Sequence, residues 1–243
     1  MGSSVDFPYY KGTPVAISAK GWVLLMLSIA CAFFIFSAIH SQQFPATLLA
    51  ALFFMGLPLL ALAVVSGRYW TALFRRVGGR EIGLMVLFAI LSMTVSLLAA
   101  IAVDAVGEDA ANPAVVRMSS MTSSEFVLRL IPTLPQLLGE ELLTILPFLA
   151  LLWLTSRCMA LGRKLSICLA LLGSSLLFAM AHLPTYDWHW MQCLGVIGSA
   201  RVVMTLAYIW TRNIWVSTGA HVLNDWTEFA FSFGLGHLPI GAD

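Results

Sequence analysis

Residues 45–66 read PATLLAALFFMGLPLLALAVVS, a stretch without one ionisable side chain. A helix needs about 20 apolar residues to cross a bilayer. Six further apolar runs follow the same pattern, at about residues 21–39, 82–103, 134–156, 165–183, 190–210 and 213–233. These runs are continuous, whereas a membrane β-barrel would alternate apolar and polar residues. The sequence therefore predicts an all-α polytopic membrane helical bundle of about seven transmembrane helices, with eight as the alternative, and places residues 1–243 in a single integral membrane domain.

The composition supports this fold class. The chain is 60% hydrophobic and 10% charged, with a mean hydropathy of +0.90, whereas an average soluble domain is about 25% charged. The lipid bilayer is thus an expected partner. A net charge of +1 argues against nucleic acid as a partner, because phosphate binding needs clustered Lys and Arg. The chain has four cysteines, Cys31, Cys158, Cys168 and Cys193, and no two of them form a CxxC motif. Their spacing therefore favours neither a zinc knuckle nor a disulfide framework.

Basic residues indicate the orientation, because Lys and Arg accumulate on the cytoplasmic side of a membrane protein. With seven spans and a cytoplasmic N-terminus, most of them fall on one face. We therefore expect an integral protein of a bacterial inner membrane with its N-terminus in the cytoplasm. Residues 104–133 are too polar to cross, and the helical spacing of Phe126, Val127, Leu130 and Ile131 predicts an amphipathic helix on the opposite surface.

The predicted spans contain a small set of ionisable groups. A charged residue at the centre of a span costs about 2.5 to 3.5 kcal/mol on insertion scales, so each needs a partner or a function. Neighbouring helical residues point about 100° apart, so Glu140 and Glu141 face different directions, whereas His221 and Asp225 share a face. The acidic, basic and histidine side chains within the spans, with Asn224 beside them, are Glu140, Glu141, His182, Arg201, His221, Asp225 and Glu228.

This set is typical of a hydrolytic site. Glutamate, histidine and aspartate side chains drawn from three helices are able to activate water and polarise a carbonyl group. Phe178 lies four residues before His182 and would place an aromatic wall under the imidazole. Arg201 is expected to be a structural counter-charge to Glu140, Glu141 or Asp225. A single buried histidine is also compatible with a structural core role, but two adjacent carboxylates are harder to explain in that way.

The order of these residues resembles the CPBP family, the CAAX prenyl proteases and bacteriocin-processing enzymes also called ABI proteins. Its members carry EExxxR, FxxxH and HxxxN/D on separate membrane helices, and this sequence has Glu140-Glu141, Phe178-Ala-Met-Ala-His182 and His221-Val-Leu-Asn224-Asp225. The similarity spans about residues 134–233, the core peptidase-like region. It implies an intramembrane endopeptidase of the glutamic type.

The resemblance also implies a role for each residue. Glu140 would be the general base that activates water, and Glu141 would orient the site. His182 would position or polarise the water. His221, together with Asp225, would stabilise the oxyanion of the tetrahedral intermediate.

Two positions depart from the family pattern. Ile145 stands where EExxxR has its arginine, and Arg201 from another helix is a candidate replacement. The last motif ends in Asp225, a carboxylate that donates a hydrogen bond only when it is protonated; Asn224 is the alternative donor.

Several alternatives stay open at this point. The resemblance requires no cofactor, yet two histidines with carboxylates are a chemically reasonable zinc set, so a zinc-dependent intramembrane metalloprotease is one alternative. A non-catalytic membrane scaffold or a transport protein is the other, because buried ionisable groups also build ion pathways. The expected substrate is a membrane-associated peptide or protein, with a lipidated one among the candidates.

Overall fold

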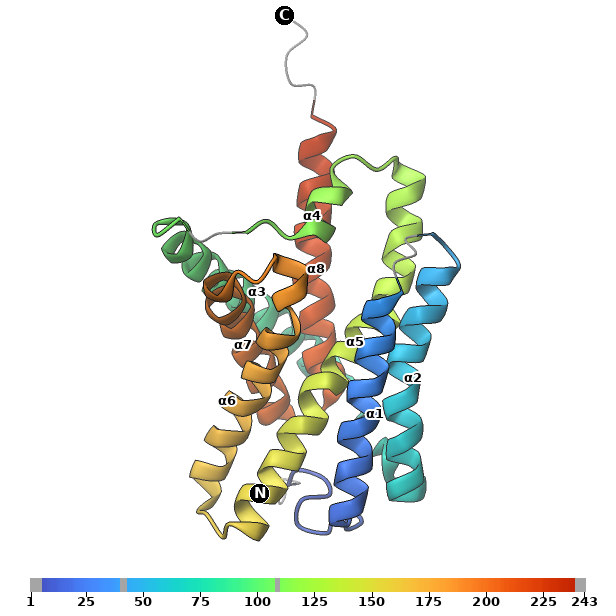
Figure 1. Ribbon diagram of the computed structural model, residues 1–243, viewed down its shortest axis with the longest axis vertical. Coiled ribbons are helices and arrows are strands. Elements are labelled where there is room, and N and C mark those ends of the chain that lie inside the picture. Colours follow the sequence, from blue (N-terminus) through green and yellow to red (C-terminus); the bar gives the residue numbers. More distant parts are fainter. Residues whose placement is uncertain (1–5, 40–42, 108–109, 239–243) are drawn as a thin grey trace, which may run out of the picture.

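The computed structural model describes residues 6–39, 43–107 and 110–238, which form helices and connecting segments without a β-strand (Figure 1). The predicted all-α class is confirmed. The long helices are α1 (Ala19–Ala38), α2 (Ala46–Ser66), α3 (Gly79–Asp104), α5 (Ser123–Trp153), α6 (Arg163–Ala181), α7 (Gly198–Thr211) and α8 (Ile214–Gly236). The shorter elements are η1 (Gly67–Leu73), α4 (Pro113–Met118), η2 (Leu154–Cys158), η3 (Leu183–Tyr186) and η4 (Gln192–Ile197).

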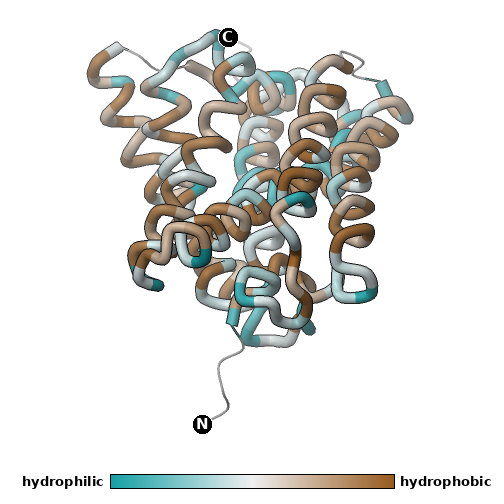
Figure 2. The backbone as a smooth tube through the Cα atoms, turned by 60° about the horizontal axis from the view of Figure 1, so that its bottom comes forward, coloured by the Kyte–Doolittle hydropathy of each residue, from teal (hydrophilic) through white to brown (hydrophobic). Residues whose placement is uncertain are grey.

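Six helical segments of the described chain are long and apolar enough to cross a membrane. Each matches one of the seven predicted spans; the segment over 192–211 joins η4 to α7. The seventh predicted span forms α8, a helix of 23 residues that is not among these six because polar and charged side chains interrupt its apolar surface. Figure 2 shows hydrophobic residues along most turns of the outer helices, the surface that a bilayer would cover.

Helix α5 lies at the centre of the bundle and packs against α1, α2, α6, α7 and α8. It has 31 residues, which corresponds to about 46 Å at 1.5 Å per residue. Its start is fixed by a capping box, in which the Thr122 side chain accepts from the Glu125 amide and the Glu125 carboxylate accepts from the Thr122 amide. The prediction of a separate surface helix before the fourth span is therefore wrong: residues 123–133 are the first turns of α5, and Phe126 stacks on Phe233 of α8 at 4.4 Å.

One end of the bundle is tied together by the N-terminal segment, residues 6–18 (Figure 1). The Tyr9 hydroxyl donates to the Tyr69 carbonyl at 2.8 Å, and Arg163 forms an ion pair with Asp6 at 2.6 Å. The chain before α3 joins the same end, because the Arg75 amide donates to the Asn213 side chain at 3.1 Å. We call this end, formed by residues 6–18, 67–78, 154–164 and 211–213, the basic end.

Candidate active site

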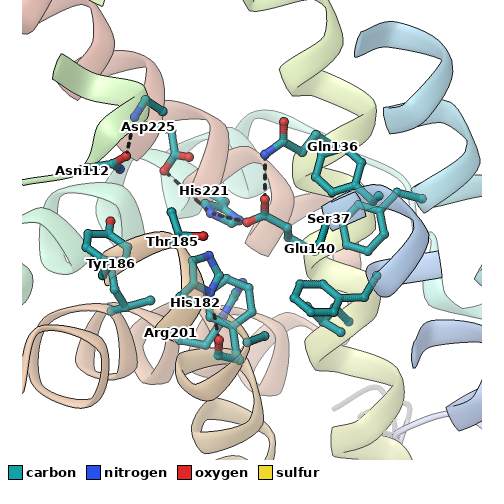
Figure 3. Close-up of a pocket in the computed structure, with 18 of the residues that line it drawn as sticks. Ser37, Asn112, Gln136, Glu140, His182, Thr185, Tyr186, Arg201, His221 and Asp225 are labelled. Atoms are coloured by element: carbon teal, nitrogen blue, oxygen red, sulfur yellow. Dashed lines mark hydrogen bonds and ion pairs between the residues drawn. The ribbon is translucent and has the colours of Figure 1, made fainter. Parts of the chain in front are cut away.

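Helix α5 presents one stripe of side chains to a cavity of about 700 Å³. Arg129, Gln136, Glu140 and Leu143 recur at helical spacing along this stripe, and all four line the cavity. The Gln136 amide donates to Glu140 Oε1 at 3.0 Å, and the Glu140 side chain is 13% exposed (Figure 3). One carboxylate oxygen of Glu140 is thus held by its own helix, while the carboxylate faces open space.

Glu141 points away from the cavity, as the 100° rotation between helical neighbours requires. Its side chain is completely buried, and Arg201 of α7 lies 2.7 Å away, between Arg201 Nη1 and Glu141 Oε1. The Arg201 guanidinium also lies over the Phe178 ring at 5.0 Å. The structure therefore gives Glu141 a cationic partner from a different helix, while Ile145 is buried in the hydrophobic core.

His221 of α8 lies among three carboxylates. Its Nδ1 is 3.0 Å from Glu141 Oε1, and its Nε2 is 3.7 Å from both Glu140 Oε2 and Asp225 Oδ1. The side chain of His221 is 7% exposed and that of Asp225 is 25% exposed. His221 thus connects the buried carboxylate of Glu141 with the two carboxylates that face the cavity.

His182 is the C-cap of α6, at the point where the chain turns into η3. Its Nδ1 lies 2.8 Å from the Phe178 carbonyl oxygen, which only accepts, so Nδ1 carries the proton and donates. The two rings are 4.4 Å apart, as the four-residue spacing led us to expect. In the neutral ring, Nε2 is then free to accept a hydrogen bond in the cavity.

Asn224 bridges two carboxylates of α8. Its amide nitrogen donates to Asp225 Oδ1 at 3.3 Å and to Glu228 Oε1 at 3.1 Å. The side-chain donor proposed for Asn224 is therefore already directed at its own helix. Its Oδ1 is buried without a hydrogen-bond partner among the described residues.

The cavity brings nearly the whole predicted set together (Figure 3). Glu140, His182, His221, Asp225, Asn224, Arg201, Phe178 and Glu228 line it, and Glu141 lies directly behind His221 and Arg201. Sequence reasoning missed Gln136, Asn112, Thr185 and Tyr186, which also line the cavity. The position of Gln136, one turn before Glu140 on the same face, is a signal that could have identified it. Asn112 precedes α4, and Thr185 and Tyr186 lie in the short element η3, so these three carry no comparable pattern.

The donor atoms do not converge on a point where one metal ion could sit. Within the described part of the chain, no three His, Cys, Asp or Glu side chains are placed to share an ion. The arrangement as it stands does not fit a tetrahedral zinc site, which needs four ligand atoms within about 2.0 to 2.3 Å of the ion.

A family model described as "Type II CAAX prenyl endopeptidase Rce1-like" matches residues 122–227. The matched region, less than half of the 243 residues, is similar to this family. The resemblance to the CPBP family is thereby confirmed, and the Rce1-like region extends from the capping box of α5 through the glutamate pair, His182 and His221. The matched family is one of CAAX-protease-like intramembrane endopeptidases, which are hydrolases, and the apolar helices of this chain indicate an integral membrane protein. No curated protein and no solved structure matches the chain.

Proposed function

We propose that the chain is an intramembrane endopeptidase of the glutamic type, with Glu140 as the general base that activates water. The observation that carries the proposal is the division between the two glutamates. Glu140 faces the cavity, and Glu141 is buried in an ion pair with Arg201, 2.7 Å away. A base must reach the substrate, whereas a supporting carboxylate must be held in place.

The reaction follows from the positions of the side chains. Glu140 accepts a proton from water, and the water oxygen bonds to the scissile carbonyl carbon. His182, with Nδ1 fixed on the Phe178 carbonyl, positions this water through Nε2. Glu140 then donates its proton to the amide nitrogen as the carbon–nitrogen bond breaks, which returns the carboxylate to its starting state.

His221 stabilises the oxyanion that forms on the carbonyl oxygen. Its Nδ1 contacts Glu141, so a second N–H at Nε2 makes the imidazole cationic, and the buried Glu141 carboxylate, which also pairs with Arg201, supplies the balancing negative charge. Charged donors aimed at a developing oxyanion are worth several kcal/mol in catalysis. Asp225, 3.7 Å from Nε2, orients the ring from the cavity side.

The substitution Glu140→Gln tests this proposal. The glutamine keeps the oxygen that accepts from Gln136 but cannot take up a proton at neutral pH, so we expect cleavage to fall by at least 10²-fold, in line with the usual contribution of a general base. Thermal unfolding in detergent should be unchanged. The matched control is Glu125→Gln, the same change on the same helix at an exposed position, which should keep its activity. Full cleavage by Glu140→Gln would exclude Glu140 as the base, and unaltered biological activity of a variant that cleaves nothing would favour a membrane scaffold or a transport protein instead.

The zinc alternative is tested separately. We expect activity to survive a metal chelator, because the side chains do not converge on an ion. Inhibition by the chelator that added zinc reverses would mean that the side chains rearrange around a metal, and it would make the protein a zinc-dependent metalloprotease.

We further propose that the protein lies in a bacterial inner membrane with its N-terminus in the cytoplasm. The supporting observation is that the basic end holds most of the Lys and Arg residues, which positive-inside orientation places in the cytoplasm. Reporter fusions after residues 120, 160 and 211 measure this directly: the last two should report the cytoplasm and the first the other side.

The substrate is proposed to be a membrane-associated peptide or protein that carries an apolar or lipid-modified portion. One wall of the cavity supports this, because Phe33, Phe36 and Phe54 of α1 and α2 line it opposite the polar groups. Phe36 and Phe54, which both line the cavity, are stacked at 4.9 Å. Such a wall offers apolar contact beside Glu140.

A further inference from the structure

The cavity opens at the end of the bundle opposite the basic end. Its rim is formed by Ile39 at the end of α1, Asn112 before α4, and Pro184 and Thr185 of η3. Thr185, on this rim, is exposed and is drawn beside His182 in Figure 3. None of the described residues of the basic end lines the cavity. A chain that reaches Glu140 through water therefore approaches from the side of α4 and η3.

The basic end is closed by aromatic packing. Phe7 and Tyr10 of the N-terminal segment are each 1% exposed. The Phe7 ring lies 5.4 Å from Phe148 of α5 and 6.1 Å from Tyr208 of α7, so it fills the space between these helices. This packing fills the core beside α5 at the basic end, and none of these four aromatic residues lines the cavity that holds Glu140.

The charge distribution assigns the two ends to opposite sides of the membrane. All but three of the 13 Lys and Arg residues lie at the basic end or in the adjoining first turns of helices. The three exceptions are Arg201, which is buried against Glu141, and Arg117 and Arg129 near the rim. By the positive-inside rule the basic end is cytoplasmic, and the rim is not.

We infer that substrates enter the Glu140 cavity from the non-cytoplasmic side of the membrane. The enzyme then acts on exported or membrane-embedded peptides whose scissile bond lies on that side, and not on tails that stay in the cytoplasm. This inference about the substrate class rests on the proposed peptidase function. The inference about the position of the entrance does not depend on that function.

The depth of the site adds a requirement on the substrate. Arg129 and Glu140 are eleven residues apart on α5, or about 16 Å along the helix axis. An extended peptide covers about 3.3 Å per residue, so roughly five residues of unfolded chain connect the rim with the general base. The substrate is thus a flexible segment or a chain end, because a folded domain could not bring its peptide bond to Glu140.

Cysteine labelling tests the entrance without any need for a substrate. The chain already has an exposed cysteine in η2 at the basic end, Cys158. In a background with Cys31→Ser, Cys168→Ser and Cys193→Ala, one variant keeps Cys158, and a second carries Cys158→Ser with Thr185→Cys on the rim. A membrane-impermeant maleimide added to spheroplasts should label the Thr185→Cys variant at once and the Cys158 variant only after permeabilisation.

Two results would overturn the inference. Labelling of Cys158 in unbroken spheroplasts would put the basic end outside, and labelling of the Thr185→Cys variant only after permeabilisation would put the rim in the cytoplasm. Because labelling does not depend on catalysis, the same pattern is expected when Glu140→Gln is added. A result that contradicts the proposed entrance is therefore distinguishable from a result that contradicts the proposed peptidase function.

The substrate class has its own measurement. Peptides from membranes and medium are compared between cells that make the protein and cells that make its Glu140→Gln variant. New chain ends that depend on Glu140 should map to segments on the non-cytoplasmic side. New ends confined to cytoplasmic segments would overturn this part of the inference, and the absence of any new end would count against the peptidase proposal itself.

Discussion

The two adjacent glutamates owe their different environments to a single helical step. Because α5 turns by about 100° per residue, Glu140 reaches the cavity while Glu141 is enclosed by α7 and α8. In the family pattern the arginine follows on the same helix, but here that position is Ile145, which is fully buried among apolar residues. The cation comes from α7 instead, so the ion pair also joins two helices.

Replacing Arg201 should therefore affect folding and catalysis together. In Arg201→Met the Glu141 carboxylate stays buried without its cation, and breaking a buried pair in this way costs about 3 to 5 kcal/mol. We expect a lower thermal unfolding temperature in detergent and loss of cleavage. The double variant Arg201→Met, Glu141→Gln removes both charges and should regain much of the stability but not the activity. Wild-type stability and cleavage in the single variant would contradict a supporting role for this pair.

At the scale of single residues, the sequence predicts which residues form the site better than it predicts which of them contact each other. Ionisable groups inside apolar runs stand out, so Glu140, His182, Arg201 and His221 could be predicted as a group. The partner of Arg201 could not be chosen among three carboxylates, because sequence spacing does not say which faces of separate helices meet. Gln136 was missed, since a neutral amide does not stand out in a span, although it lies one turn from Glu140.

At the scale of the helices, apolar runs predict their existence well and their ends less well. The apolar run at 134–156 does not include the first turns of α5, because Glu125 and Arg129 make the residues before this run polar. The capping pair of Thr122 and Glu125 is visible in the sequence and does mark the true start. With this start, Glu140 lies near the middle of α5 and not close to one end, so the site is deeper than the apolar run alone suggests.

The contact between α2 and α5 depends on a glycine beside the glutamates. A Cβ atom at Gly139 would lie 2.6 Å from Cδ1 of Phe54, a ring that is itself stacked on Phe36. We expect Gly139→Ala to cost about 1 to 3 kcal/mol through overpacking and to reduce cleavage, because α5 and α2 must separate next to Glu140. Thermal unfolding and activity assays measure both effects.

The control for this effect is Gly56→Ala on α2. A Cβ atom there meets nothing within 4 Å, so this variant should be as stable as the wild type or slightly more stable, given the better helix propensity of alanine. The double variant Gly139→Ala, Phe54→Val should recover stability because the smaller side chain makes room. Equal effects of the two alanine substitutions would mean that close packing at Gly139 is not the cause.

At the scale of the whole molecule, the bundle has one closed end and one end that gives access to the site. The composition alone predicts a membrane protein, and the apolar runs predict nearly the right number of membrane-spanning helices. The closure could not be predicted, because the N-terminal segment mixes polar residues with Pro8 and Pro14 and shows no apolar run, whereas Phe7, Tyr9 and Tyr10 are buried in the core. Aromatic residues outside the apolar runs are a weak signal in a sequence, and only tertiary packing distinguishes them from interface anchors.

The closure of the basic end should weaken in acid because it depends on the ionised Asp6. Burial raises the pKa of this carboxyl, but hydrogen bonds from Arg163, the Phe7 amide and Tyr10 outweigh the burial and hold the pKa well below its usual value. Since the folded pKa is depressed, Asp6 stabilises the fold above its unfolded pKa of about 3.9, and the stabilisation is lost as the pH falls below that value.

The prediction concerns the difference between the wild type and Asp6→Asn. Asparagine cannot form the ion pair, so the wild type should unfold at a higher temperature at pH 7, and the gap should narrow progressively below about pH 4. Lys11→Gln is the control, because Lys11 is a more distant partner of Asp6, at 3.6 Å, and half-exposed, so its loss should leave the narrowing in place. A gap that stays constant down to pH 3, measured by thermal unfolding in detergent, would show that the charge of Asp6 does not hold the N-terminal segment against α6.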